Sequence, residues 1–360
     1  MQSPGPPPSR LFSRSGARSL RLAIGCAGLL LALAATVEAE PAIPTVAELD
    51  REPLIERAIM LRLARTPDHH VRFSDSGAAS SNVDYEQQAA DHWFIENQRY
   101  GADLVEAGLI AGNPEVSQLG WKILDWGFAR QQPNGGFGDT GDPFHSTSFF
   151  VEAAARAVLC ARQAGDRNAQ QLAARYAPKI AAAAHWMLRP DVLKRGLKNN
   201  QPYTHRRWLV AAAWGLAGEV TGEAELSRAA ADMARDGLKL QLADGVNPEK
   251  AGYDVSYQAV GLLMAARYYT VCRDRALRDQ VRGMLSRGLD WEVGKIDAAG
   301  EVSLAGSTRI TSESGRSGAA KTLDTKAIVM ALANGTQITG RSKFKDAALH
   351  VARHVRWIKD

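Results

Sequence analysis

Residues with catalytic capability collect in four polar segments, 131–146, 198–208, 244–258 and 306–321, and each segment precedes an apolar helical run. N-caps would use one residue per segment, such as Ser146, Thr204, Asp254 and Thr322. Capping does not explain the remaining residues, namely His145, Asn199, Asn200, Tyr203, His205, Arg206, Tyr253 and Tyr257. Amides, imidazoles and guanidinium groups can neutralise a carboxylate, and a tyrosine can transfer a proton. We therefore expect these residues to share one functional cleft.

The elements that position these segments are helices. Helical periodicity runs through nearly the whole chain, and long alternating Val/Ile/Thr runs are missing, which predicts an all-α fold. A repeat occurs four times, starting near Ser146, Tyr203, Tyr253 and Thr322. Each copy has an apolar first helix, a short polar turn and a more charged second helix. A less regular pair, 85–111 and 114–131, precedes the four copies.

The composition of the two helices of each repeat predicts which one is enclosed and which one faces water. A helix that is apolar on most of its circumference is enclosed by neighbours, whereas a helix with a charged stripe faces water. Hairpins with one helix inside and one outside close into an (α/α) toroid or incomplete barrel; an open solenoid is the alternative. In a toroid all inner helices run the same way, so the four polar segments would meet at one end.

A family resemblance follows from the pair Asn199-Asn200, which precedes an aromatic residue and a helix, and from Tyr257 in the sequence SYQAVGLL. This pattern resembles the α/α-toroid polysaccharide lyases, in particular the alginate lyases with an Asn-Asn-His segment and a later catalytic tyrosine. The resemblance covers roughly residues 85–290. Gln201 stands where that family has histidine, and Lys250 where an arginine is expected. His205 could fill the role of the missing histidine.

The resemblance implies cleavage of a 4-linked uronic acid polymer, of alginate or glucuronan type, by β-elimination. That reaction needs a neutralised carboxylate, a base for the C5 proton and an acid for the departing glycosidic oxygen. We expect Asn200, His205 and Arg206 to neutralise the carboxylate, Tyr257 to act as the acid and possible base, and His145 to assist. The expected substrate-binding residues are Tyr253, Asn199, Tyr203, Lys250, Arg309, Arg316 and Phe137.

Two other classes of function remain open. A glycoside hydrolase on the same toroid would need two carboxylates facing the cleft, with Asp139, Asp142, Glu249 and Asp254 as candidates. A non-catalytic glycan-binding protein would use the same aromatic residues and arginines without turnover. Trp121 and Trp126 could stack on a sugar but are expected in the core. His350 and His354 lack a third ligand, so we expect no metal, and no cofactor motif is present.

The N-terminal segment carries most of the basic excess. Residues 1–39 hold four arginines, an apolar run of about 15 residues and small residues before Glu40, a pattern typical of a cleavable signal peptide. Removing it, with four arginines and Glu38, lowers the net charge from +5 to +2. We therefore expect a single catalytic domain, 40–360, that is periplasmic or secreted and monomeric. Its expected partner is an anionic polysaccharide, with no nucleic acid and no membrane.

Overall fold

The computed structural model describes residues 43–49, 74–79, 81–82, 92–138, 140–250, 252–310, 312–314 and 320–358, which belong to one compact unit, Ile43–Asp360. The predicted signal peptide lies outside the described residues. Short elements come first: α1 (Val46–Leu49), β1 (Ser81–Asn82), β2 (His92–Trp93) and the 3₁₀ helix η3 (Ile95–Arg99). The helices of the ring are α3 (Tyr100–Ala111), α4 (Pro114–Phe128), α5 (Pro143–Gln163), α6 (Ala169–Leu188), α7 (Pro190–Asn200), α8 (Thr204–Thr221), α9 (Ala224–Leu238), α10 (Val255–Val271), α11 (Arg275–Val293), α12 (Thr325–Thr339) and α13 (Ser342–His354).

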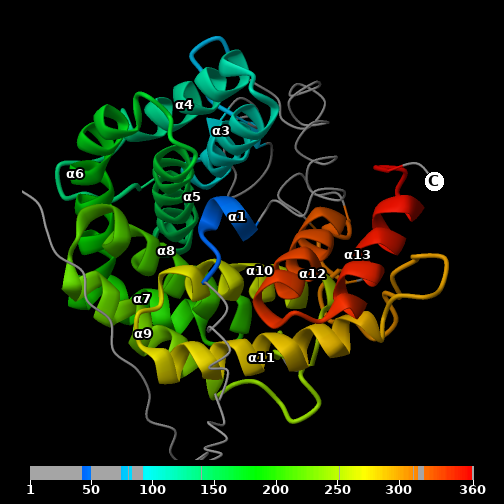
Figure 1. Cartoon of the computed structure of the whole chain (residues 1–360). Helices are drawn as coiled ribbons and strands as arrows, with labels where there is room; N and C mark the ends of the chain where they lie inside the picture. Colours follow the sequence, from blue (N-terminus) through cyan, green and yellow to red (C-terminus); the bar gives the residue numbers. More distant parts are fainter. Residues whose placement is uncertain are drawn as a thin grey trace, which may run out of the picture. The chain divides into compact units, whose positions relative to one another are not determined.

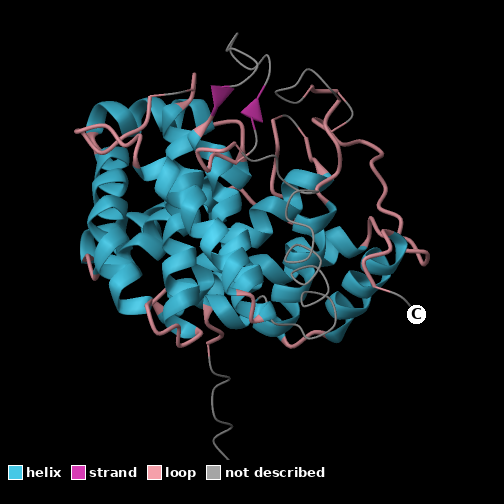
Figure 2. Ribbon diagram, turned by 90° about the horizontal axis from the view of Figure 1, so that it is seen from above, coloured by secondary structure: helices cyan, strands magenta, loops and turns pink. Residues whose placement is uncertain are grey.

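The helices form two concentric layers, which confirms the predicted all-α toroid (Figure 1). The inner helices α5, α8, α10 and α12 pack side by side, α3 packs against α5, and α1 lies against three of the inner helices. The outer helices α6, α9, α11 and α13 follow their inner partners in the chain. Figure 2 shows that β1 and β2, which pair antiparallel, are short strands at the edge of a helical body.

Burial follows the predicted division between inner and outer helices. In α8 every residue from Arg207 to Gly218 is buried, whereas α9 buries a single stripe that includes Leu226, Ala230 and Met233. An enclosed helix needs an apolar residue at nearly every position, and an outer helix needs one face. The sequence difference between the two helices of each repeat therefore sets which layer each one occupies.

The inner helices run parallel, as expected. Arg206 in the first turn of α8 pairs with Asp142, the N-cap of α5, and Arg162 at the end of α5 donates to the carbonyl oxygen of Val220 near the end of α8. The first turns of α5 and α8 therefore lie together, and so do their last turns. This direction brings the segments before α5, α8, α10 and α12 to one end of the ring, which we call the rim.

Two glycine turns lead from outer helices to the rim. Gly135 and Gly245 have φ values of +91° and +95°, a region that favours glycine. A Cβ at Gly135 would lie 2.2 Å from the backbone oxygen of Ala182, and one at Gly245 would lie 2.4 Å from that of Arg287. Each turn thus packs directly on the next outer helix, which fixes the segment that continues to the rim.

Helix α7 was not predicted from the sequence. This helix is short and strongly polar, PDVLKRGLKNN, and only its last residues fall in the predicted polar segment 198–208. Asn199 and Asn200 therefore lie in the last turn of a helix, not in a loop. The first helix of the irregular pair also differs, because α3 begins at Tyr100 after η3, while residues 83–91 lie outside the described part of the chain.

Cys160 and Cys272 are both buried, with free thiols. The thiol of Cys160 donates to the carboxylate of Glu106, and that of Cys272 to the carbonyl oxygen of Asp274. None of the described helices is long and apolar enough to cross a membrane.

Candidate active site

The rim brings residues from four separate segments into contact. The ring of His205, on α8, lies 4.7 Å from the ring of Tyr257, on α10, and 6.4 Å from that of His145, on α5. The guanidinium carbon of Arg309, from the segment before α12, lies 3.6 Å from the centre of the Tyr257 ring. The predicted convergence of His145, His205 and Tyr257 is confirmed by these distances.

His205 is held by a carboxylate. Its Nδ1 lies 2.7 Å from Oε1 of Glu249, and its backbone N–H donates to the same oxygen at 3.0 Å. Because a carboxylate accepts, Nδ1 carries the ring proton, and Nε2 is left as an acceptor. Burial lowers the pKa of His205; the charge of Glu249 opposes this shift, and the charges of Arg206 and Arg309 add to it. His205 is thus neutral near pH 7, with Nε2 able to accept a proton, whereas the sequence predicted that it would help to neutralise a carboxylate.

Glu249 is positioned by a tight turn. It is 1% exposed, forms isolated β-bridges with Tyr203 and Gly252, and accepts a hydrogen bond from Arg309 Nη1 at 3.2 Å. The next residue, Lys250, has a φ of 57°, an uncommon conformation for a residue with a side chain. From the sequence, Glu249 was a candidate only for one of the two carboxylates of a hydrolase. Its partnership with His205 joins residues 44 positions apart, and no local signal marks it.

A second carboxylate gathers the cations near Tyr257. Glu313 accepts from Arg309 Nε at 3.1 Å and forms ion pairs with Lys250 and Lys321. Burial alone would raise the pKa of Glu313, but the hydrogen bonds from Lys250 and Lys321 and the charge of Arg309 lower it to about 2. Lys250 is thus placed at the rim as predicted, although it is already paired.

Arg206 and Asn200 form a polar cluster that contains two buried donors without acceptors among the described residues. Arg206 Nη1 donates to Asp142 at 2.8 Å and to the Asn200 side-chain oxygen at 3.2 Å. Within the described residues, the buried Nε of Arg206 and the buried Nδ2 of Asn200 have no acceptor. A buried donor without an acceptor costs about 1–3 kcal/mol, so this pair is suited to an added anion or water. The ring of Tyr203 lies 4.5 Å from Arg206 and 4.7 Å from Arg309, which places both guanidinium groups on one patch.

Some predicted binding residues lie elsewhere. Phe137 is 2% exposed and packs edge-on against Phe150, so its assignment to substrate stacking was wrong. Asn199 is exposed on α7, on the other side of the chain from the buried Asn200. Arg316 lies outside the described residues.

Tyr253 makes its contacts beside the His205–Tyr257 cluster rather than within it. Its hydroxyl donates to the carbonyl oxygen of Ala305 at 2.6 Å, and its ring packs edge-on against Trp291 at 4.9 Å. Lys295 lies 4.5 Å from the same ring. Tyr253, two residues before α10, therefore has different contacts from Tyr257, which lies in the first turn of that helix.

The carboxylates considered for hydrolysis are engaged in the structure. Asp142 pairs with Arg206, Glu249 pairs with His205 and Arg309, and Asp254 caps α10 while accepting from two further backbone N–H groups. Asp139 lies outside the described residues. In the part of the chain that is described, no group of three or more His, Cys, Asp or Glu side chains could hold a metal ion.

Comparison with known proteins adds information on the fold. No family model matches the sequence, and no curated protein matches it. A crystal structure of a protein from Actinoplanes is similar with a TM-score of 0.51 and 16% identity, over 83% of this chain and 80% of that one. An ent-copalyl diphosphate synthase from Streptomyces platensis matches with a TM-score of 0.41 and 15% identity, over 80% of this chain and 51% of that one. The likeness to the first concerns the fold alone.

Proposed function

We propose that the protein is a polysaccharide lyase that cleaves a 4-linked uronic acid polymer by β-elimination at the rim. The observation that carries the proposal is the placement of a neutral, carboxylate-held His205 beside Tyr257, next to buried donors that lack acceptors. A base, an acid and an anion site are the three parts that this reaction requires. Export to the periplasm or the medium, and a monomeric state, belong to the same proposal.

The substrate carboxylate would bind at Asn200 and Arg206. Asn200 Nδ2 and Arg206 Nε are donors, and hydrogen bonds from a charged donor to a carboxylate are the stronger kind. Neutralising the carboxylate makes the adjacent C5 proton more acidic, because charge that develops at C5 is drawn toward the carboxylate. The start of α8 adds the positive end of a helix dipole at the same place.

The proton transfers would use His205 and Tyr257. His205 Nε2 takes the C5 proton, the C4–O bond breaks, a C4=C5 double bond forms, and Tyr257 donates its hydroxyl proton to the departing oxygen. Glu249 holds the Nδ1–H and stabilises the imidazolium that forms, as a carboxylate does beside a catalytic histidine. The guanidinium of Arg309, which lies against the Tyr257 ring, stabilises the phenolate left behind.

The test uses the double bond that the reaction creates. The purified protein is mixed with mannuronate, guluronate and glucuronate polymers, and the ultraviolet absorbance of the unsaturated product is followed. We expect absorbance to rise with at least one polymer, and Tyr257→Phe to remove it while polymer binding survives. Tyr269→Phe, at the far end of the same helix, is the matched control and should keep the wild-type rate. New reducing ends without absorbance would indicate hydrolysis instead, and binding without either product would indicate a binding protein.

A further inference from the structure

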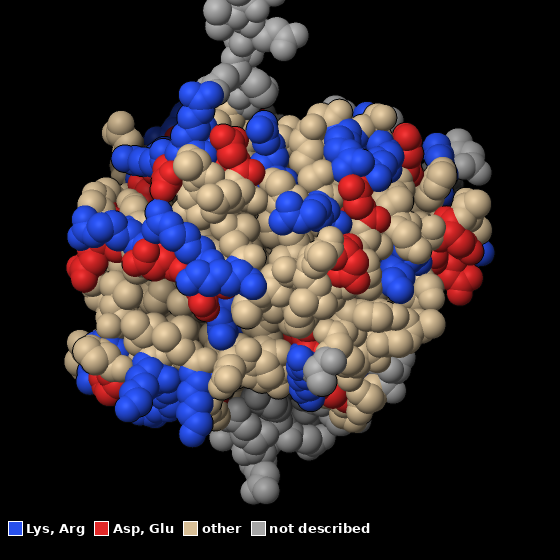
Figure 3. All heavy atoms as spheres, turned by 90° about the horizontal axis from the view of Figure 1, so that it is seen from below, with Lys and Arg blue, Asp and Glu red and all other residues tan. Residues whose placement is uncertain are grey.

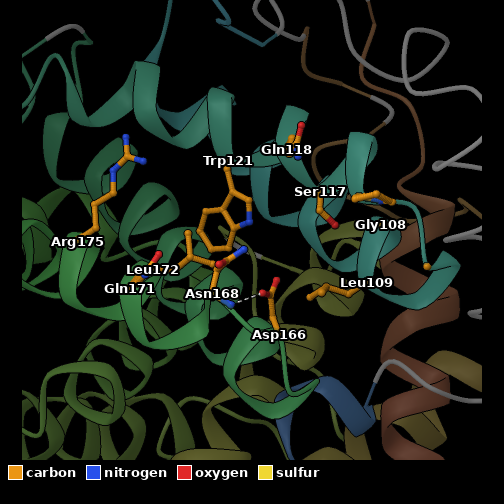
Figure 4. Close-up of a pocket in the computed structure, with 12 residues that line it drawn as sticks. Gly108, Leu109, Ser117, Gln118, Trp121, Asp166, Asn168, Gln171, Leu172 and Arg175 are labelled. Carbon is orange, nitrogen blue, oxygen red and sulfur yellow. Dashed lines mark hydrogen bonds between the residues drawn. The ribbon is translucent and has the colours of Figure 1, made fainter.

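A hollow of about 650 Å³ lies beside the turn that follows α5, at the opposite end of the ring from the rim, and Figure 4 shows the residues that line it. It is formed between the start of α4, the α3–α4 turn and the start of α6. Six of its lining residues matter for the argument, namely Leu109, Gln118, Trp121, Asn168, Gln171 and Leu172. Its volume is in the range of small-molecule sites. The hollow is next to the end of α5, whose 21 residues separate it from the rim by roughly 30 Å.

An aromatic platform forms one wall of the hollow. Trp121 is half-buried and stacks on Tyr176, with ring centres 5.3 Å apart and an angle of 11° between the planes. Tyr176 is fixed from behind, because its hydroxyl donates to Asp125 at 2.7 Å and its ring stacks on Phe128. The position of the Trp121 indole is therefore set before any ligand binds, and the indole borders the hollow (Figure 4).

Polar side chains around the platform are not used by the fold. Asn168 is the N-cap residue of α6, yet its side chain makes no capping hydrogen bond. The exposed amides of Gln118 and Gln171 also make no hydrogen bond with other described residues. An amide can both donate and accept, which matches the hydroxyl groups of a sugar. Three uncommitted amides around one indole thus form a site suited to a pyranose ring.

Two charged side chains line the hollow, and both have hydrogen-bonding or ionic partners within the protein. Arg175 pairs with Asp125 at 2.7 Å, and Asp166 accepts from the backbone N–H of Asn168 at 2.7 Å. A ligand therefore meets an apolar ring face, amides and the Asp166 carboxylate, which is also an acceptor for hydroxyl groups. This arrangement favours hydroxyl recognition, in contrast to the charge-rich rim.

We propose that this hollow is a second saccharide-binding site, which stacks a hexopyranose unit on Trp121 and hydrogen-bonds its hydroxyls through Asn168, Gln118 and Gln171. The site does not depend on the chemistry of the rim, and it accepts neutral and uronate sugars alike. In a protein that acts on a polymer, it would hold the chain at a point too distant for a short oligosaccharide to reach both sites.

The test measures binding of defined tetrasaccharides to the full chain by titration calorimetry and ligand-observed NMR. The probes are cellotetraose, maltotetraose and a tetramannuronate. We expect at least one neutral tetrasaccharide to bind saturably, with an affinity that changes less than threefold between low and high salt, because no charge pair is involved. Gln118→Ala/Gln171→Ala should weaken this binding about tenfold or more, since two hydrogen bonds are lost.

Two further variants make the test specific. Gln170→Ala changes the exposed neighbour of Gln171, which does not line the hollow, and should bind as the wild type does. Trp121→Ala should abolish binding. If loss of the stack on Tyr176 unfolds that variant, Gln118→Ala/Gln171→Ala still tests the site. The proposal is overturned if no neutral tetrasaccharide binds saturably, or if binding is unchanged in the double glutamine variant. Neither result would bear on the lyase proposal, because the neutral probes do not contain a uronate.

Discussion

Two clusters of buried charge in this molecule are built differently. At the ring centre, Arg156 uses all three nitrogens of its guanidinium group, on Asp103, Glu106 and Glu152, and its side chain is 2% exposed. At the rim, Arg206 uses Nη1 alone, and its buried Nε has no acceptor among the described residues. Both arginines lie on inner helices.

The central cluster joins the two sides of the ring. Asp103 on α3 also pairs with Lys326 on α12 at 2.7 Å, and Glu152 on α5 pairs with Arg267 on α10 at 3.1 Å. Burial alone would lower the pKa of Arg156, but the charges of Glu106, Glu152 and Asp103 raise it well above its usual value. Arg156 is thus fully paired, although the buried Nε of Arg267 has no acceptor among the described residues. We expect this cluster to serve the fold.

The rim differs because it is incomplete. Open donors at Asn200 and Arg206, a neutral His205 and a residue with positive φ, Lys250, each cost free energy in the folded protein. Arg156 has all three guanidinium nitrogens paired, whereas Arg206 does not, and this contrast between the two arginines supports the proposal that a ligand binds at the rim. The variants below test that distinction. Figure 3 shows acidic and basic side chains intermixed on one face of the molecule, rather than a uniformly basic surface. This agrees with binding by particular donors at the rim rather than by a broad positive charge.

The largest effect on stability is expected for Arg156→Met. It leaves three carboxylates near the ring centre without their main cation, and breaking a buried pair in this way costs about 3–5 kcal/mol of unfolding free energy. Arg206→Met is the matched control: Asp142 stays 19% exposed and caps α5, so the cost should not exceed about 2 kcal/mol, although turnover is lost. Urea denaturation measures both. Equal costs would remove the contrast between the clusters.

The next largest effect, which concerns turnover rather than stability, is expected for Glu249→Gln. The amide cannot hold the Nδ1–H of His205 with a charge, and turnover should fall on the order of a hundredfold or more. Because Glu249 raises the pKa of His205, its loss should also shift the acid limb of the kcat/KM profile to lower pH. A merely structural role would lower the rate without moving this limb. An unchanged profile would mean that Glu249 does not position the base.

Much of the fold could be predicted from the sequence, because hydrophobic periodicity is a local property. It identified the inner and outer helices of the four repeats and the end at which their first turns meet. It failed for α7, which is 11 residues long and mostly polar, so that its apolar residues Val192, Leu193 and Leu197 cover fewer than two turns. Tertiary contacts, rather than periodicity, stabilise such a helix.

The candidate site could be predicted only in part. His205 and Tyr257 follow from their places at the starts of inner helices, which the direction of the chain brings together. The partner of His205 did not follow, since several rim carboxylates were available and their pairing depends on the turn at Lys250. Phe137 was misassigned because the turn at Gly135 directs the following residues into the core, a consequence of backbone geometry rather than residue type.

A smaller effect concerns stability as a function of pH. The folded protein holds His205 at a lowered pKa, so between that value and about 6.5 the unfolded state binds more protons. Stability therefore rises with pH in this window and is lost as pH falls below about 6.5. His205→Gln should flatten the pH dependence of the unfolding free energy between pH 5 and 7. Glu313, whose pKa is lowered to about 2, makes a separate contribution to stability, which is present above about pH 4.5 and lost as pH falls toward 2. Identical pH profiles for the variant and the wild type would contradict a buried neutral His205.

The smallest change in stability is expected for Asn200→Ala, and it isolates the open donors from the fold. The variant loses the hydrogen bond from Arg206 but also removes a buried Nδ2 without an acceptor, so the two effects offset each other to within about 1 kcal/mol. The backbone oxygen of Asn200, which accepts from Arg207 at 2.6 Å, is retained. Turnover should still fall at least tenfold, because the substrate carboxylate loses a donor. Asn199→Ala, one position earlier and exposed, should change neither quantity. Equal losses of turnover in the two variants, measured by product absorbance, would show that the buried donor of Asn200 has no special role and that the rim resembles the ring centre after all.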